Sequence, residues 1–302
     1  MNWETLYCPN RKCKYYGIPF GEGKLVKNGS SGGRARVRCL GCHRSVTLSY
    51  GTAYYKLKSK PEIFEIGFRA LAEGNSIRAT GRILQVDKDT ICDWLNRTAH
   101  QCRRVLLFHL RPDEHVLECQ LDELWSFVHT KQQHLATAKR FHETYGDAWV
   151  WIAYAPIWRF VLAFVVGERT QENANLLMKR VAHVTDETIP FYTSDQLSFY
   201  PHALLEVHGQ WYQPKLCYTR GRFPLPRRVP LPGLLYAQVV KRREKGRVVE
   251  VTRKVIFGQE EQIDARLATS PTSSTINTSF VERENLTFRQ ANRRLTRKTN
   301  VK

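Results

Sequence analysis

The sequence is short of acidic side chains, and it lacks segments that would place it in several common classes. Its 302 residues hold 28 Asp and Glu against 47 Lys and Arg, which gives a formal net charge of +19. The chain opens without an apolar segment, so we expect no secretory signal peptide. We find no P-loop or other evident ATP site, and we therefore expect no ATP-driven activity.

A long uninterrupted apolar run is also absent. The nearest candidate, 148–167, is about as long as a membrane span, but Pro156 and Arg159 lie near its middle. Aromatic and β-branched residues fill both halves, which favours two buried strands joined by a turn. We therefore expect no membrane partner.

The charge is unevenly distributed along the chain. Residues 1–60 hold 12 basic and 2 acidic side chains, and residues 209–258 have the same balance, whereas residues 113–208 hold 7 and 13. The basic excess indicates a polyanionic partner, most simply nucleic acid, although any single charge run is more often a solvated face. The acidic block is compatible with carboxylates gathered around metal ions.

Four of the eight cysteines form two close pairs near the start of the chain, Cys8 with Cys13 and Cys39 with Cys42. Two such pairs across a polar, Gly-rich stretch have the spacing of a zinc ribbon, in which four thiolates hold one ion tetrahedrally. So short a segment has little core without a metal. Structural Zn²⁺ is therefore predicted.

Short strands over 24–27 and 34–38 are expected between the two cysteine pairs. Two disulfides are the competing interpretation, but they imply an oxidising compartment that nothing else supports. His43 is an alternative ligand. The other cysteines are interpreted as structural: Cys92, Cys102, Cys119 and Cys217.

The segment from Pro61 to Phe108 has helical periodicity. Pro61 suits a first turn, residues 73–76 end that helix, a second helix is predicted over 77–84, and Asp87 can cap a third. Two short helices and a third after a brief turn resemble a helix-turn-helix; a plain three-helix bundle is the alternative. The groove-facing candidates for DNA contact are Lys88, Thr90, Asn96 and Arg97.

The acidic centre is predicted to be a mixed α/β domain. We expect three antiparallel strands, then a helix capped by Thr170, another strand, and a late helix; the ranges are 116–128, 148–155, 160–166, 171–184, 189–195 and 280–298. Asp122 and Asp195 end the first and fourth strands, and Glu282 lies early on the late helix. This order is that of a ribonuclease-H-like domain.

Three carboxylates are the ligands that two Mg²⁺ or Mn²⁺ ions require for in-line displacement at a phosphodiester. Asp122 is the candidate to bridge the ions, and Asp195 and Glu282 flank it.

At these residues the sequence resembles transposases of the insertion sequence 1 family. The matching segments are 121–128 (LDELWSFV), 164–170 (FVVGERT), 192–195 (YTSD) with Phe199-Tyr200, 281–290 (VERENLTFRQ) and 294–299 (RLTRKT). The order of zinc segment, helix-turn-helix and acidic domain also matches that family's layout. The likeness covers most of the chain, and its motifs are specific in combination.

The resemblance implies cleavage and strand transfer of DNA at the ends of an insertion sequence. It assigns a DDE triad to Asp122, Asp195 and Glu282, and substrate-DNA contact to Arg289, which lies two turns after Glu282. Arg293 and Arg294 are further DNA-binding candidates. The main rivals to these assignments are Glu123 and Glu284, by adjacency, and Glu206 is another because it is closer to Asp195 in sequence.

Two departures from the family pattern stand out. Residues 209–275 lengthen the interval between the second and third acids, and 234–240 with 247–257 predict a basic β-hairpin insertion that either clamps DNA or decorates the surface. The sequence stops at Lys302, where related proteins usually continue, so a truncated copy is one expectation.

The expected domains are a zinc ribbon over 1–58, a helix-turn-helix over 59–112 and a ribonuclease-H-like catalytic domain over 113–302. The predicted function is DNA transposition by a DDE transposase. The alternatives are a DNA-binding regulator that has lost catalysis and a metal-dependent nuclease. Double-stranded DNA is the expected partner, two DNA ends call for a homodimer or larger assembly, and the resemblance implies a bacterial or archaeal cytoplasm, associated with the nucleoid.

Overall fold

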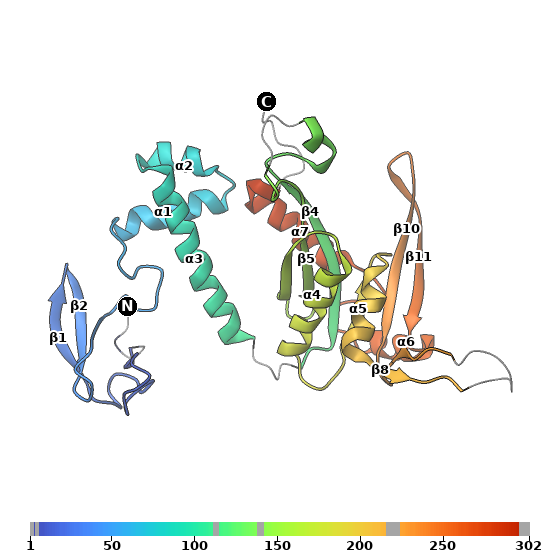
Figure 1. Ribbon diagram of the computed structural model, residues 1–302, viewed down its shortest axis with the longest axis horizontal. Helices are drawn as coiled ribbons and strands as arrows, with labels where there is room; N and C mark the ends of the chain where they lie inside the picture. Colours follow the sequence, from blue (N-terminus) through green and yellow to red (C-terminus); the bar gives the residue numbers. More distant parts are fainter. Residues whose placement is uncertain (1–2, 4–5, 111–114, 138–141, 216–223, 296–302) are drawn as a thin grey trace. The chain divides into compact units, whose positions relative to one another are not determined.

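The protein is described from a computed structural model in which the chain divides into two compact units, Met1–Leu106 and Leu107–Lys302 (Figure 1). In the described part of the chain, no helix is long and apolar enough to cross a membrane. The structure describes all residues except 1–2, 4–5, 111–114, 138–141, 216–223 and 296–302.

The first unit opens with a three-stranded antiparallel sheet of β1 (Leu25–Ser31), β2 (Arg34–Cys39) and β3 (Ser45–Thr47). Both predicted strands are confirmed, and the hairpin that they form reaches further than its sequence pattern indicated. Its small core joins aliphatic side chains such as Val37 and Val46 to the cysteines. The sheet therefore holds the cysteine pairs close together.

Three helices complete the first unit: α1 (Pro61–Ala72), α2 (Ile77–Leu84) and α3 (Lys88–His109). The predicted start signals act as expected, because the Ser76 hydroxyl accepts a hydrogen bond from Ala79 N and the Asp87 carboxylate accepts one from Asp89 N. Close packing of α1 on α3 requires Gly67, where an added Cβ would lie 2.6 Å from the Trp94 ring. Trp94, Ile91 and Phe64 form a core separate from that of the ribbon.

The second unit is built on a six-stranded mixed sheet in the order β11-β10-β7-β4-β5-β6. β4, β5 and β6 are antiparallel neighbours, and β7 runs parallel to both β4 and β10. The predicted antiparallel trio and the fourth strand are thus confirmed. Their bounds are β4 (Glu118–Val128), β5 (Gly146–Ala155), β6 (Phe160–Gly167), β7 (Phe191–Ser194), β10 (Tyr236–Glu244) and β11 (Arg247–Phe257).

Helices pack on both faces of this sheet at β5, which explains the nearly continuous apolar run of that strand. Alternation along β5 sends Trp151 toward α5 (Phe199–His208), beside α4 (Gln171–Val184), and sends Ile152 to the opposite face. There it packs with Val281 of α7 (Ser279–Ala291). α6 (Glu260–Ala268) covers β10.

The segment treated above as an insertion contributes to the sheet itself. β10 pairs in parallel with β7, through Ala237 opposite Thr193, so the predicted hairpin supplies two strands rather than an addition beside the sheet. Only its distal half extends with exposed side chains on both strands. β8 (Gly209–Tyr212) and β9 (Arg227–Pro230) form a separate two-stranded sheet.

The predicted helix over 280–298 is shorter than expected. α7 ends at Ala291, because Asn292 adopts an extended backbone and its side-chain oxygen accepts a hydrogen bond from Arg294 N. The 3₁₀ turn η3 (Arg293–Leu295) follows, and a second such turn, η2 (Gln132–Thr137), precedes β5.

Candidate metal centres and nucleic-acid contacts

The four N-terminal cysteines converge as predicted, with their sulfur atoms within 4.8 Å of one another. The Sγ atoms of Cys8 and Cys42 are 3.6 Å apart, and those of Cys13 and Cys39 are 3.8 Å apart. A disulfide requires about 2.05 Å, so these contacts are those of separate thiols. The cluster is compatible with a tetrahedral zinc site.

The electrostatics of the cluster differ from one sulfur to the next. Burial raises the pKa of Cys8 to about 12, whereas the backbone N–H of Arg44 lowers the pKa of Cys42 to about 6. A lowered pKa favours the thiolate, which is the form of cysteine that binds a metal. His43 does not join the group; its ring lies 3.4 Å from the Arg38 guanidinium.

Asp122 and Asp195 meet where β7 ends beside β4; β4 itself continues to Val128, so Asp122 lies within its strand and does not end it as predicted. The last paired residues of β4 and β7 are Leu121 and Ser194, so the residue that follows each of them along the chain is one of the two aspartates. The carboxyl ends of adjacent parallel strands open at one edge of a sheet, where ligands commonly bind. The local chain geometry thus brings the two predicted acids together across 73 residues.

Both aspartates are partly buried, and both have raised pKa values. Burial, followed by the charge of Glu123, raises the pKa of Asp122 to about 7. Burial also raises the pKa of Asp195, whose carboxylate accepts a hydrogen bond from Leu197 N at 3.1 Å. Such a pair costs free energy when ionised, and a divalent cation would offset that cost.

Glu123 is the third carboxylate of the group, its oxygen lying within 4.8 Å of those of Asp122 and Asp195. It reaches them because β4 continues beyond the end of β7. Arg169 donates to one oxygen at 2.5 Å, and the Tyr200 hydroxyl donates to the other at 2.9 Å. These partners hold Glu123 in place, and the sequence had offered it only as a rival.

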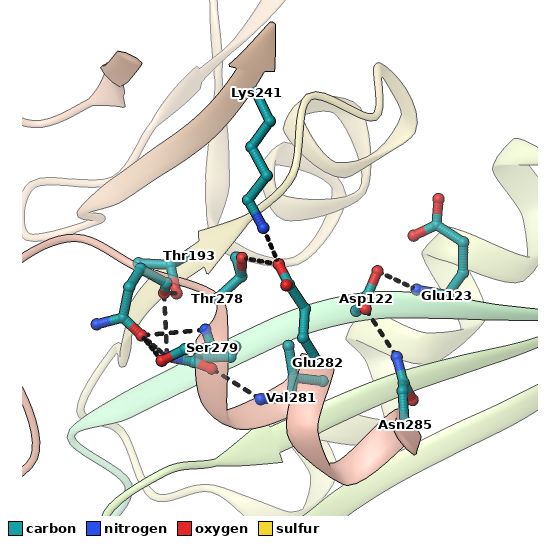
Figure 2. Close-up of polar contacts among 11 residues, drawn as sticks. Asp122, Glu123, Thr193, Lys241, Thr278, Ser279, Val281, Glu282 and Asn285 are labelled. Carbon is teal, nitrogen blue, oxygen red and sulfur yellow. Dashed lines mark hydrogen bonds and ion pairs between the residues drawn. The ribbon is translucent and has the colours of Figure 1, made fainter. Parts of the chain in front are cut away.

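Glu282 does not join this group, contrary to the expectation for the third acid. Its carboxylate instead pairs with Lys241 of β10 and accepts a 2.5 Å hydrogen bond from Thr278, as Figure 2 shows. Glu282 still lies near enough for its charge to raise the pKa of Asp195.

The other rivals also lie outside the cluster. Glu206 is engaged elsewhere, 3.6 Å from both Lys179 and Arg228. Glu284 is half-buried, and its charge adds to the effect of burial in raising the pKa of Tyr154.

Asn285 is a site residue that the sequence analysis missed. Its side-chain amide donates to Oδ2 of Asp122 at 2.7 Å (Figure 2), yet its own Oδ1 has no hydrogen-bond partner in the described part of the chain. The residue is only 6% exposed, so the bare oxygen is costly. Its position one helical turn after Glu282 was the available signal.

The predicted DNA-contact residues of the third helix are only partly suited to that role. Lys88 and Asn96 are exposed, and Thr90 is half-buried. Arg97 does not face outward as predicted, because its guanidinium donates to Asp93 at 2.6 Å and to the Tyr55 carbonyl at 2.7 Å.

The predicted contacts after Glu282 also differ in exposure. Arg289 is half-buried and donates to the Leu295 carbonyl at 2.8 Å, whereas Arg294 is exposed. The side chain of Arg293 lies outside the described part of the structure.

Comparison with known proteins does not assign the chain to a family. No protein-family model matches it, and no curated protein matches it either.

Proposed function

We propose that the protein is a transposase of the DDE type, a metal-dependent enzyme that cuts and joins DNA. The observation that carries the proposal is the meeting of Asp122, within β4, and Asp195, directly after the neighbouring parallel strand β7. The sheet around them supports a ribonuclease-H-like domain, because three antiparallel strands are followed by a helix and then by a strand parallel to the first.

The residues fit a hard divalent cation such as Mg²⁺ or Mn²⁺. Asp122, Asp195 and Glu123 offer carboxylate oxygens within 4.8 Å of one another, and the bare Oδ1 of Asn285 is buried beside them. When bound, such an ion supplies Lewis acidity at a phosphodiester and lowers the pKa of a water molecule. The chain's own contribution is to hold the oxygens in place through Asn285, Arg169 and Tyr200.

The proposed reaction has two steps of one kind. In the first, the oxygen of water bonds to phosphorus at an element end, and the bond to the 3′ oxygen breaks to leave a 3′-hydroxyl and a 5′-phosphate. In the second, that hydroxyl bonds to a target phosphorus and displaces the target's own 3′ oxygen. Because the attacking groups are water and a DNA hydroxyl, and neither is a protein side chain, no covalent link between protein and DNA is expected.

The basic segments support DNA as the substrate. A net charge of +19 favours a polyphosphate backbone, and it predicts affinity that falls steeply with salt. The zinc-ribbon cysteines and the three helices of the first unit supply elements of a DNA-binding region. A helix-turn-helix role for α2 and α3 is part of the proposal.

One observation favours a second candidate, a regulator that binds the same DNA without cutting it. The ion pair of Glu282 with Lys241 keeps the predicted third acid out of the carboxylate group, and Glu123 in that group is itself paired with Arg169. A protein left in this arrangement would retain the DNA-binding elements and lose catalysis.

Cleavage of DNA carrying the sequences that flank this coding region tests the proposal. Wild type, Asp122→Asn and the exposed control Asp264→Asn are compared with Mg²⁺, with Mn²⁺, and with no added metal. Omission of the metal is preferable to EDTA, which would also strip zinc from thiolates. Metal-dependent nicking by wild type and the control, lost in Asp122→Asn, supports the enzyme. Binding without cleavage under every condition supports the regulator.

A further inference from the structure

A cleft of about 530 Å³ opens within the first unit. One wall comes from the chain around the first cysteine pair, one from the segment after β3, and one from α3. This volume lies within the range of small-molecule sites, about 300–1,000 Å³. It is large enough for one or two nucleotides and too small to admit a duplex.

The α3 wall is basic. Arg97, His100 and Arg104 are spaced three and four residues apart, so they lie on one face of the helix. Arg97 and Arg104 each give one hydrogen bond to the backbone of the facing segment, at Tyr55 and Gly51, and Arg97 also pairs with Asp93 at 2.6 Å. A guanidinium carries five N–H donors, so both retain donors for a phosphate.

The opposite walls are aromatic. Tyr7, Tyr16 and Tyr50 line the cleft and are 38%, 45% and 37% exposed. Tyr7 and Tyr16 pack edge to face at 6.5 Å between ring centroids, and Tyr50 packs in the same way on Tyr55 at 5.1 Å. Edge contacts of this kind leave ring faces available for stacking.

Charge balance in the cleft points to an anion. Arg11, which is exposed, adds a third arginine to the lining, and none of the described lining residues is acidic; Asp93, which pairs with Arg97, lies outside the lining. Cationic side chains alone would bind any phosphate, but three exposed tyrosines favour a phosphate ester that bears aromatic bases. That combination is typical of sites that bind single-stranded nucleic acid.

We propose that this cleft binds single-stranded DNA, with unpaired bases on the tyrosines and the backbone on the arginines. The inference rests on the proposed function in taking DNA as the partner, but it requires no cleavage. In this proposal, Arg97, His100 and Arg104 contact a single strand, whereas the exposed residues at the start of α3 are the candidates for contact with the groove of duplex DNA. In a cut-and-join enzyme, such a site would hold strands that separate near an element end.

Binding is measured with the full, zinc-loaded chain in the absence of Mg²⁺. The probe is a 5′-fluorescein oligothymidylate of about 12 nucleotides, within the site sizes known for single-strand binders. The variants are Tyr50→Ala, Tyr50→Phe, and the control Tyr212→Ala, an exposed tyrosine of the second unit. A duplex of equal length is measured in parallel.

The expected result is a loss of single-strand affinity of about five- to a hundredfold in Tyr50→Ala, the range for loss of base stacking. Tyr50→Phe should retain affinity because its ring remains, and Tyr212→Ala should bind as wild type. Duplex affinity should change less than single-strand affinity. Displacement by free thymidine monophosphate at similar concentration would identify a free nucleotide as the ligand and overturn the strand proposal.

Equal single-strand affinity in Tyr50→Ala and wild type would also overturn the proposal. Should Tyr50→Ala lose its zinc or fail to fold, Arg11→Glu on the exposed loop provides the same test through charge. Binding is read without a divalent ion, so an inactive carboxylate site leaves this result unchanged. The cleavage experiment likewise stands if the cleft binds nothing.

Discussion

Asn285 of α7 donates a 2.7 Å hydrogen bond to Oδ2 of Asp122 on β4, although 163 residues separate the two in sequence. The bond fixes one carboxylate oxygen, and the backbone N–H of Glu123 fixes the other at 2.9 Å. Asp122 is therefore held in a single orientation before any ion arrives. Groups that orient a metal ligand commonly affect metal affinity as strongly as some ligands do.

Replacing Asn285 with alanine should weaken Mg²⁺ binding and metal-dependent cleavage by about 10- to 100-fold. Gln290→Ala removes an exposed amide from the same helix and should have little effect. Isothermal titration with Mg²⁺ separates the two variants without relying on activity. Unchanged affinity in Asn285→Ala would show that the hydrogen bond to Asp122 is structural only.

The sequence predicted the parts of the fold and site that depend on local signals. Asp122 and Asp195 were found because each follows a short run that forms a strand, and the structure places Asp122 on β4 next to the end of β7, where Asp195 follows. The start of α4 followed from Thr170, whose side chain accepts a hydrogen bond from Asn173 N. Such signals lie within a few residues of the feature they specify.

The partners of those residues could not be predicted in the same way. Lys241 meets Glu282 only because β10 joins the sheet beside β7, and no pattern near Lys241 indicates that pairing. Glu123 reaches the aspartates because β4 continues past the point where its neighbour β7 ends. That offset depends on how the two strands pair and not on either strand alone. Nonlocal pairing of this kind lies outside the periodicity of a single segment.

The pKa of Asp122 makes stability depend on pH in an unusual direction. Its folded-state value of about 7 exceeds the ordinary 3.8, so the contribution is complete below pH 4 and is lost as pH rises through 7. This pH-dependent contribution of Asp122 to the free energy of unfolding is on the order of 4 kcal/mol at most. Without divalent ions, Asp122→Asn should therefore gain stability relative to wild type between pH 4 and 7.5, as measured by thermal unfolding.

Asp186 provides a control, because its pKa is shifted in the opposite direction from that of Asp122. A hydrogen bond from His115 lowers the pKa of Asp186, so its contribution is present above pH 3.8 and is lost as pH falls through the lower folded value. Asp186→Asn should therefore be the less stable protein at and above pH 4. Parallel pH profiles for the two variants would contradict the assignment of a raised pKa to Asp122.

Substitution of Cys39 should remove the bound zinc and loosen the ribbon. Cys39 is fully buried against Cys13 and the β-strand core, so Cys39→Ser loses a ligand and much of the metal's support for folding. Cys102→Ser changes an exposed thiol on α3 and should retain one zinc per chain. Zinc content and proteolysis within residues 6–48 are the measurements.

The disulfide interpretation makes the contrary prediction for the same proteins. Intact mass under non-reducing conditions would then show two internal disulfides in wild type, and zinc would be absent from both wild type and Cys102→Ser. The sulfur separations of 3.6 Å and 3.8 Å favour the metal.

The ion pair between Lys241 and Glu282 makes a prediction that separates enzyme from regulator. Lys241 competes with any metal ion for the Glu282 carboxylate, because both are cations that would bind the same carboxylate oxygens. Lys241→Ala leaves Glu282, among the described residues, with the Thr278 hydrogen bond alone and should raise Mg²⁺ affinity if Glu282 is a ligand. Arg243→Ala, which removes an exposed cation from the same strand, controls for general charge.

The double variant Lys241→Ala, Glu282→Gln completes the comparison. If Glu282 becomes a metal ligand, the gain from Lys241→Ala should disappear when the carboxylate is replaced, since the two changes act on one oxygen pair. If the gain persists, Lys241 opposes the metal through its charge alone, and Glu123 is the third acid of the site. Loss of cleavage in Lys241→Ala despite tighter metal binding would instead place this lysine in contact with DNA phosphate.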